Sequence, residues 1–317
     1  MTEIGYSLSS EEHRPPDLIG YARRAEEAGF RFALISDHFH PWVDHQGHSA
    51  FVWTVLGGIA QATERLEVGT GVTCPTIRIH PAIIAQAAAT TADLFGGRFF
   101  LGVGSGENLN EHITGSRWPP VDQRLEMLEE AVGVIRELWK GELTTHYGKH
   151  YTVENARIYT VPEELPPIHF AGAGDKAAEM AGRLGDGFIG TAPDPETIQT
   201  FTNSGGEGKP RYGQMTVCWA ADEAEARKTA LEWWPNAGLS GQLTQELALP
   251  SHFEQAASLV TEDKLAESFP VGPDPERHLS SIREYFDAGY DHVYVHQIGP
   301  DQAGFFDFYE KEILPKL

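Results

Sequence analysis

A short apolar run, Phe32-Ala33-Leu34-Ile35-Ser36, passes directly into the polar segment Asp37-His38-Phe39-His40-Pro41-Trp42. Successive apolar residues of this kind are typical of a strand that is buried on both faces, as strands are in a parallel sheet. Similar runs, short and rich in β-branched or aromatic residues, recur along the whole chain. The strand-like runs are residues 4–8, 32–36, 66–72, 99–103, 168–171, 187–191, 214–220 and 292–296.

Helical patterns separate these runs, at residues 18–28, 52–63, 82–94, 125–139, 177–184, 223–233 and 276–288. Gly29, Gly185 and Gly289 follow three of these helices, at the position where glycine often ends one. Strands that alternate with helices form parallel sheets, and this number of units predicts a closed α/β structure, a (β/α)₈ TIM barrel. A doubly wound open sheet is the alternative, but no reversal point is visible along the chain.

Two segments depart from the repeat, and we expect them to be insertions on the C-terminal face of the barrel. Residues 141–167 contain Thr144-Thr145-His146-Tyr147-Gly148-Lys149, a pattern typical of a β-hairpin that turns at Gly148. Residues 234–272 mix helical and loop signals after the seventh strand. Insertions of this size in a barrel usually lie on the loops that cover the active site. We therefore expect a single domain, residues 1–317, with two excursions.

Composition and charge exclude several classes of function. The chain has 46 Asp and Glu against 24 Lys and Arg, and its net charge of −22 repels nucleic acid and anionic membranes. No apolar run approaches the roughly 20 residues of a membrane helix. The N-terminus lacks the pattern of a secretion signal, and Cys74 and Cys218 are too few for a disulfide framework, so we expect a cytoplasmic protein. Because the chain is so acidic, an anionic cofactor would have to be bound by backbone N–H groups and a few local cations.

Polar residues follow the second strand, where barrel enzymes place their active sites. Asp37, His38, His40 and Trp42 offer an acid, possible bases and a stacking surface in one barrel mouth. The alternative is that Asp37 caps the next element, His40 is solvated and Trp42 packs against a neighbouring loop. We favour the functional interpretation.

Glycine-rich segments follow the third, fourth and fifth strands. Small residues around Gly71 and Val72 let the backbone approach a flat ring closely. The run Gly102-Val103-Gly104-Ser105-Gly106 lacks the last glycine and the later acidic residue of a dinucleotide-binding fingerprint. Glu107, which follows it, is placed for proton transfer or for capping a helix.

The fifth strand leads into Gly172, Ala173, Gly174, Asp175 and Lys176, where a helix N-terminus and a lysine could meet an anion. An ordinary turn capped by Asp175 is the alternative.

Metal binding is a further alternative, because His38, His40, His45 and His48 are close in sequence. The ends of strands one, four, five and six offer no further ligand except Glu107 and the start of the fifth helix, and His296 is the one distant candidate. We therefore expect no metal.

Four blocks, in this order and spacing, resemble the luciferase-like monooxygenase superfamily, and within it the coenzyme F420-dependent oxidoreductases similar to glucose-6-phosphate dehydrogenase. The resemblance covers essentially the whole chain. The blocks are residues 36–42 with 47–48, 69–72 with 75–76, 101–110, and 182–188.

The resemblance implies that coenzyme F420 is bound in the barrel mouth. It implies contacts to the ring and its ribityl chain from Asp37, Ser105, Gly106, Glu107 and Asn110. A cis peptide between Gly71 and Val72 would lie against the ring, and the loop with Gly172, Ala173, Gly174 and Lys176 would face the phosphate.

The resemblance also implies catalytic roles. His38 would be the base that accepts the substrate hydroxyl proton as hydride passes to the ring, which agrees with its ordinary pKa of about 6.5. Trp42 would shape the pocket and Glu107 would manage a proton at the deazaflavin. Thr191 and His296 are assigned with Trp42 to the substrate pocket.

The sequence departs from sugar-phosphate-oxidising relatives at two basic positions. Asp194 takes the place of one lysine, and the other basic position falls near Glu267, with Lys264 close by. We therefore expect an uncharged alcohol or its ketone as the substrate, and not glucose 6-phosphate.

Three other interpretations stay open: an FMN-dependent monooxygenase on the same barrel, a barrel that binds the deazaflavin without turnover, and a metal-dependent hydrolase. Apolar helices such as residues 82–94 make a homodimer plausible.

Overall fold

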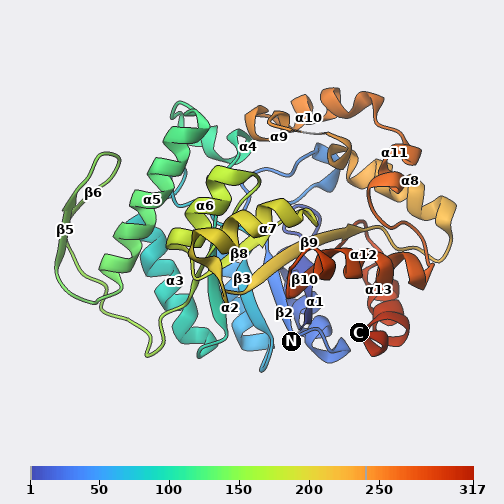
Figure 1. Cartoon of the computed structure of the whole chain (residues 1–317), viewed down its shortest axis with the longest axis horizontal. Helices are drawn as coiled ribbons and strands as arrows, with labels where there is room; N and C mark the ends of the chain where they lie inside the picture. The colour runs from blue at the N-terminus through green and yellow to red at the C-terminus, as the bar shows by residue number, and fades with distance from the viewer. Residues whose placement is uncertain (1, 240) are drawn as a thin grey trace.

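Eight parallel strands close into a barrel in the computed structural model, which describes residues 2–239 and 241–317 (Figure 1). The order around the barrel is β1-β10-β9-β8-β7-β4-β3-β2, and pairing of β1 with β10 closes it. The predicted TIM barrel is confirmed. The barrel strands are β1 (Glu3–Leu8), β2 (Phe32–Ile35), β3 (Glu67–Thr70), β4 (Phe99–Val103), β7 (Ile168–Ala171), β8 (Gly187–Gly190), β9 (Arg211–Val217) and β10 (His292–Gln297).

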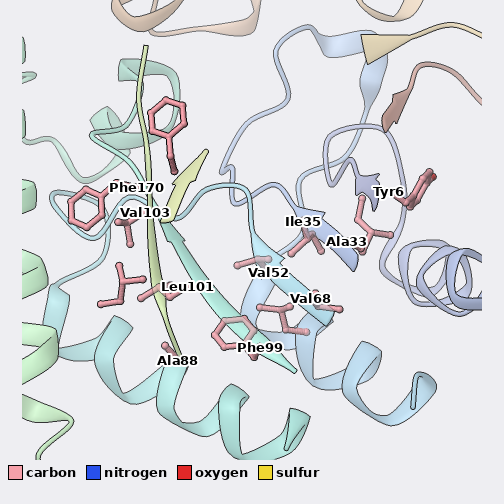
Figure 2. Close-up of a cluster of buried hydrophobic side chains, with 14 of the residues drawn as sticks. Tyr6, Ala33, Ile35, Val52, Val68, Ala88, Phe99, Leu101, Val103 and Phe170 are labelled. Carbon is pink, nitrogen blue, oxygen red and sulfur yellow. The ribbon is translucent and has the colours of Figure 1, made fainter. Parts of the chain in front are cut away.

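Alternate residues of each strand face the two sides of the barrel wall, which explains why strands such as β2 and β4 are apolar throughout. In β2, Phe32 and Leu34 point inward and join a cluster that fills the barrel. Ala33 and Ile35 of the same strand point outward, into the layer beneath the helices (Figure 2). The inner cluster needs glycine on neighbouring strands, because a Cβ at Gly5 would lie 2.4 Å from the Phe32 ring.

Helices surround the barrel and cover the outward-facing side chains. The longer helices are α1 (Pro15–Ala28), α2 (Val52–Ala62), α3 (Pro81–Phe95), α5 (Val121–Leu138), α6 (Asp175–Leu184), α8 (Glu223–Trp233) and α12 (Pro275–Asp287). The shorter ones are α4 (Asn108–Glu111), α7 (Pro195–Phe201), α9 (Leu243–Glu246), α10 (Pro250–Ala256), α11 (Glu262–Ser268) and α13 (Gln302–Phe308). No helix in the described ranges combines the length and the apolar character needed to cross a membrane.

Two short helices, α7 and α13, and the end of α6 differ from the sequence-based expectation. Helices α7 and α13, which follow β8 and β10, were not predicted, because each has only seven residues and little periodicity to detect. Gly29 and Gly289 have the expected positive φ, at 101° and 103°. Gly185 instead has a φ of −80°, so α6 ends in extended backbone.

The two insertions lie in different places. Residues 141–167 form the expected hairpin, β5 (Thr144–Tyr147) and β6 (Thr152–Ala156), which lies outside α5 (Figure 1). It is held there by Glu130 of α5, which accepts from the backbone N–H groups of Lys149, His150 and Tyr151. No described residue of this hairpin lines the central cavity, so this insertion does not cover the barrel mouth. The second insertion carries α9, α10 and α11 across the end of the barrel away from the N-terminus, and several of its residues line the cavity.

Candidate active site

A cavity of about 880 Å³ opens at the carboxyl ends of the barrel strands. Every residue that the sequence assigned to the site lines it, although they come from six strand ends. These residues are Asp37, His38, Trp42, Gly71, Val72, Ser105, Gly106, Glu107, Asn110, Gly172, Ala173, Gly174, Lys176, Thr191 and His296. Among the described residues, no three His, Cys, Asp or Glu side chains are grouped to hold a metal ion.

A buried ion pair between Glu11 and His38 lines the cavity at the ends of β1 and β2. Nδ1 of His38 lies 2.8 Å from Oε1 of Glu11, and the contact is close although poorly aligned for a hydrogen bond. Glu11 also accepts at Oε2 from the hydroxyls of Ser36, at 2.6 Å, and Ser9, at 3.1 Å. Because Nδ1 faces Glu11, Nε2 is the His38 nitrogen that is left for a ligand.

This pairing fixes both side chains in their charged forms near neutral pH. Burial alone would raise the pKa of Glu11, but the charge of His38 and the hydrogen bonds lower it to about 2. Burial alone would lower the pKa of His38, but the charge of Glu11, and to a smaller extent that of Glu107, raise it to about 9. His38 is therefore an imidazolium at neutral pH, and it must lose this proton before it can act as the base that the resemblance implied.

Sequence reasoning missed Glu11, because it credited the end of the first strand with no polar ligand. The segment Ser9-Ser10-Glu11-Glu12-His13 is in fact buried although every residue in it is polar. Two adjacent glutamates directly after an apolar strand were the available signal.

Trp42 packs edge-on against His38, with ring centroids 5.1 Å apart. Its other neighbour is Phe253 of α10, at 5.2 Å, so the second insertion fixes the tryptophan from outside. The backbone N–H of Trp42 donates to Oε1 of Gln46, which holds the loop after β2 in place.

Asp37 is held from beneath by Arg78, a residue that the sequence did not single out. Oδ1 of Asp37 accepts from Arg78 at 2.8 Å, and Oδ2 accepts from the Thr73 hydroxyl at 2.7 Å. The backbone N–H of Arg78 also donates to Glu111 of α4, and both charged side chains are buried. Arg78 therefore ties the loop after β2 to the helix after β4.

The glycine loop after β4 brings Ser105, Gly106 and Glu107 to the cavity. Gly106 has a φ of 80°, and a Cβ there would lie 2.6 Å from Sγ of Cys74, so both conformation and space require glycine. Asn110 accepts at Oδ1 from the backbone N–H groups of Phe39 and His40. Its side chain thus anchors the loop that carries His38, a structural role that the sequence did not indicate.

The peptide bond between Gly71 and Val72 is cis, as the resemblance implied. It lies in the cavity wall beside the glycine loop after β4, because a Cβ at Gly104 would lie 2.7 Å from Cγ2 of Val72. The two loops therefore present a close-packed surface of backbone to the cavity.

The loop after β7 places the start of α6 at the cavity, with Gly172, Ala173 and Gly174 leading into it. Lys176 is the only lysine or arginine among the described residues that line the cavity. Its Nζ donates to Oδ1 of Asp122 at 2.6 Å, and the side chain is 69% exposed.

The two acidic positions that set this chain apart in sequence do not face the cavity. Asp194 caps α7 by accepting from the Glu196 backbone N–H, and neither it nor Glu267 lines the cavity. Direct repulsion by these two carboxylates is therefore not how a phosphate would be excluded. The wall there is formed instead by Thr191, Ser268, Phe269, Ser281, Glu284 and Tyr285.

The chain is similar in sequence to known proteins. Residues 1–292 match the model of the luciferase-like monooxygenase family. The chain is 36% identical over 326 residues to an F420-dependent glucose-6-phosphate dehydrogenase of Microbacterium testaceum, covering 99% of this chain and 97% of the relative. It is 35% identical over 330 residues to the enzyme of the same name from Amycolatopsis mediterranei, covering 100% and 99%.

Two solved structures have the same fold. One is an F420-dependent secondary alcohol dehydrogenase in complex with an F420-acetone adduct, with a TM-score of 0.91, 32% identity and 98% of each chain covered. The other is the coenzyme F420-dependent tetrahydromethanopterin reductase of Methanopyrus kandleri, with a TM-score of 0.79, 20% identity and 99% of each chain covered.

Proposed function

The chain belongs to the luciferase-like monooxygenase family, and on that premise we propose that it is a coenzyme F420-dependent oxidoreductase that interconverts an alcohol and its carbonyl compound. The observation that carries the proposal is the buried Glu11–His38 pair at the wall of a cavity bounded by glycine loops. Such a pair supplies a proton donor and acceptor beside the place where a substrate oxygen would lie.

The residues present fit a flat, anionic cofactor. Gly104 and Gly106 have no side chains, so a flat ring could approach the backbone there closely. A Cβ at these positions would collide with Val72 and Cys74, respectively. At the other end, Gly174 has a φ of 91° with open space around it, directly before α6. Backbone N–H groups at that helix start, with Lys176, would hold a phosphate. Glu107 would face the ring.

When bound, the deazaflavin of coenzyme F420 accepts a hydride from the substrate or returns one to it. His38 handles the accompanying proton through Nε2. As an imidazolium near neutral pH, it donates a proton to the carbonyl oxygen during reduction, and it must first lose that proton to act as the base in oxidation. Glu11 keeps the ring oriented, and Trp42 limits its movement.

We propose an uncharged substrate. Lys176, the only described lysine or arginine at the cavity, is assigned above to the cofactor phosphate, and the other residues that line the cavity include Ser268, Ser281 and Glu284. A phosphorylated sugar would therefore find no second cation among the described lining residues, and its charge would be poorly compensated.

The test begins with titration of the purified protein with oxidised coenzyme F420 and, separately, with FMN. Neutral secondary alcohols and glucose 6-phosphate are then added, and loss of the deazaflavin absorbance is followed. We expect bleaching with neutral alcohols, loss of bleaching in His38→Ala, and little reaction with glucose 6-phosphate. Preference for FMN would favour a monooxygenase, and binding without any turnover would favour a carrier.

We also propose a cytoplasmic homodimer. Cys74 and Cys218 are both buried and unpaired, as in a reducing compartment. Ile83 and Leu94 of α3 are large apolar residues that stand about half exposed, at 56% and 45%, and would be covered in a dimer. Light scattering on the purified chain would distinguish one copy from two.

A further inference from the structure

Two consecutive glutamates at the end of β1 each hold a histidine of the same cavity. Glu11 pairs with His38, as described above. Glu12 accepts at Oε2 from Nε2 of His296 at the end of β10, over 2.8 Å, and at Oε1 from the Gly299 backbone N–H, over 2.9 Å. Both histidines line the cavity, but the proposed function uses only the first pair.

A tryptophan stands against each of these histidines. The ring centroids of Trp42 and His38 are 5.1 Å apart, and those of Trp234 and His296 are 4.4 Å apart. Both tryptophans line the cavity and pack in one hydrophobic cluster with Cys218 and Ile298. Each histidine therefore lies beside a tryptophan of the cavity lining, and the two tryptophans pack in the same cluster.

The second imidazole has an unused hydrogen-bonding atom. His296 is 2% exposed, and its Nδ1 is buried with no hydrogen-bond partner in the described part of the chain. His13 and His169 are also buried with one unpartnered ring nitrogen, but neither lines the cavity, whereas the core residue His278 has a partner on each ring nitrogen. A buried polar atom without a partner is unfavourable, so a histidine kept beside a cavity in this condition points to a ligand that completes it.

We propose that His296, positioned by Glu12, binds a second hydroxyl group of the substrate, which is then a polyhydric alcohol, such as a vicinal diol, or the derived hydroxyketone. The inference rests on the proposed function, in which His38 serves the reacting oxygen. A hydroxyl suits the position because it both donates and accepts, and so it can pair with Nδ1 in either protonation state of the ring. A substrate that lacks this hydroxyl would leave Nδ1 unpaired, which is how such a site selects between close analogues.

The first test compares substrates that differ by one hydroxyl. We would measure kcat/KM for propan-2-ol against propane-1,2-diol, and for butan-2-ol against butane-2,3-diol, in the wild type and in His296→Phe. The wild type should prefer the diols by about tenfold, as expected for one hydrogen bond to a buried group. In His296→Phe this preference should vanish, so that each diol and its monohydric counterpart react with similar kcat/KM.

Two further variants separate a ligand contact from a general effect on packing. His13→Phe is the matched control. His13 follows Glu12 in the sequence, is buried and has an unpartnered Nε2, but it does not line the cavity. It should keep the diol preference. Glu12→Ala should raise KM for the diols more than KM for the monohydric alcohols, as expected of a positioning residue. The inference is overturned if His296→Phe keeps the wild-type preference.

The second test does not need turnover. In protein labelled with ¹⁵N-histidine and loaded with oxidised coenzyme F420, the Nδ1 resonance of His296 is identified by its absence from His296→Phe. It should shift when propane-1,2-diol is added and not when propan-2-ol is added. No shift with the diol overturns the inference. A shift without reduction of the cofactor by any alcohol would support the hydroxyl site and contradict the proposed function.

Discussion

At the scale of single residues, Glu11 controls the charge on the residue proposed to move a proton. Burial lowers the pKa of His38, and the charge of Glu11 more than offsets this; replacing Glu11 by glutamine removes that charge, so the pKa should fall from about 9 to its ordinary value near 6.5 or below. Ketone reduction, which needs the imidazolium, should then decline above about pH 6.5 in Glu11→Gln, whereas the wild type holds its rate toward pH 9. The measurement is the pH profile of kcat/KM in both proteins. Glu12→Gln is the matched control and should keep the wild-type profile; coincident profiles in all three would exclude this role for Glu11.

Gly104 is a second residue at which the addition of a single Cβ atom should change cofactor binding. A Cβ there would lie 2.7 Å from Cγ2 of Val72, and neither residue can retreat far within the close-packed wall. Gly104→Ala should therefore push Val72 into the cavity and weaken the binding of coenzyme F420 by about tenfold, the cost of modest overpacking. Fluorescence titration with the cofactor measures this. Gly133→Ala on α5, where a Cβ has open space, should bind normally and serves as the control.

At the scale of elements, Arg78 joins the loop after β2 to α4. Its side chain is 6% exposed and contacts Asp37 and Glu111, so removal of the guanidinium leaves two buried carboxylates without a cation. Arg78→Met should lower the free energy of unfolding by about 3–5 kcal/mol, as is typical of a broken buried pair. Arg183→Met, which removes an exposed pair between α6 and Glu129 of α5, should cost less than about 1 kcal/mol. Urea unfolding measures the free energy of unfolding of both variants. Equal losses of stability in the two variants would contradict the proposal that Arg78 joins the loop after β2 to α4.

The same elements show how far sequence reasoning reached. The barrel was predictable because buried strands such as β2 and β4 are apolar throughout and alternate with amphipathic helices, which is a local property. The residues predicted for the site line one cavity because they follow those strands. For Glu11 the adjacent glutamates after an apolar strand were a local signal, but that signal does not identify His38 as the partner. Arg78 was missed because its importance depends on Asp37, 41 residues away, which no local pattern reveals. The structural use of Asn110, which fastens the loop of His38, was hidden for the same reason.

At the scale of the whole molecule, buried histidines set the pH range of stability from opposite sides. His38 has its pKa raised to about 9 by Glu11, so its contribution is complete below pH 6.5 and is lost as the pH rises toward 9. Burial lowers the pKa of His169 and His278 to about 4. In the unfolded chain both would bind protons near pH 6.5, so their contributions are lost as the pH falls from 6.5 toward 4. Stability should therefore be greatest near neutral pH.

His169 offers a direct measurement of the acid side. It lies in the barrel interior against Phe100 and Tyr212, with ring centroids 4.9 and 5.1 Å away, and its Nδ1 has no hydrogen-bond partner among the described residues. A phenylalanine can occupy this stack without a group that protonates. In the wild type, protonation of the unfolded chain should cost about 2 kcal/mol of stability at pH 5 relative to neutral pH through this residue alone. His169→Phe should lose correspondingly less between pH 7 and pH 5, whereas His45→Phe at the surface should follow the wild type. Urea unfolding gives the free energy of unfolding at each pH. If it fell equally between pH 7 and pH 5 in the wild type and in His169→Phe, the proposed contribution of His169 would be wrong.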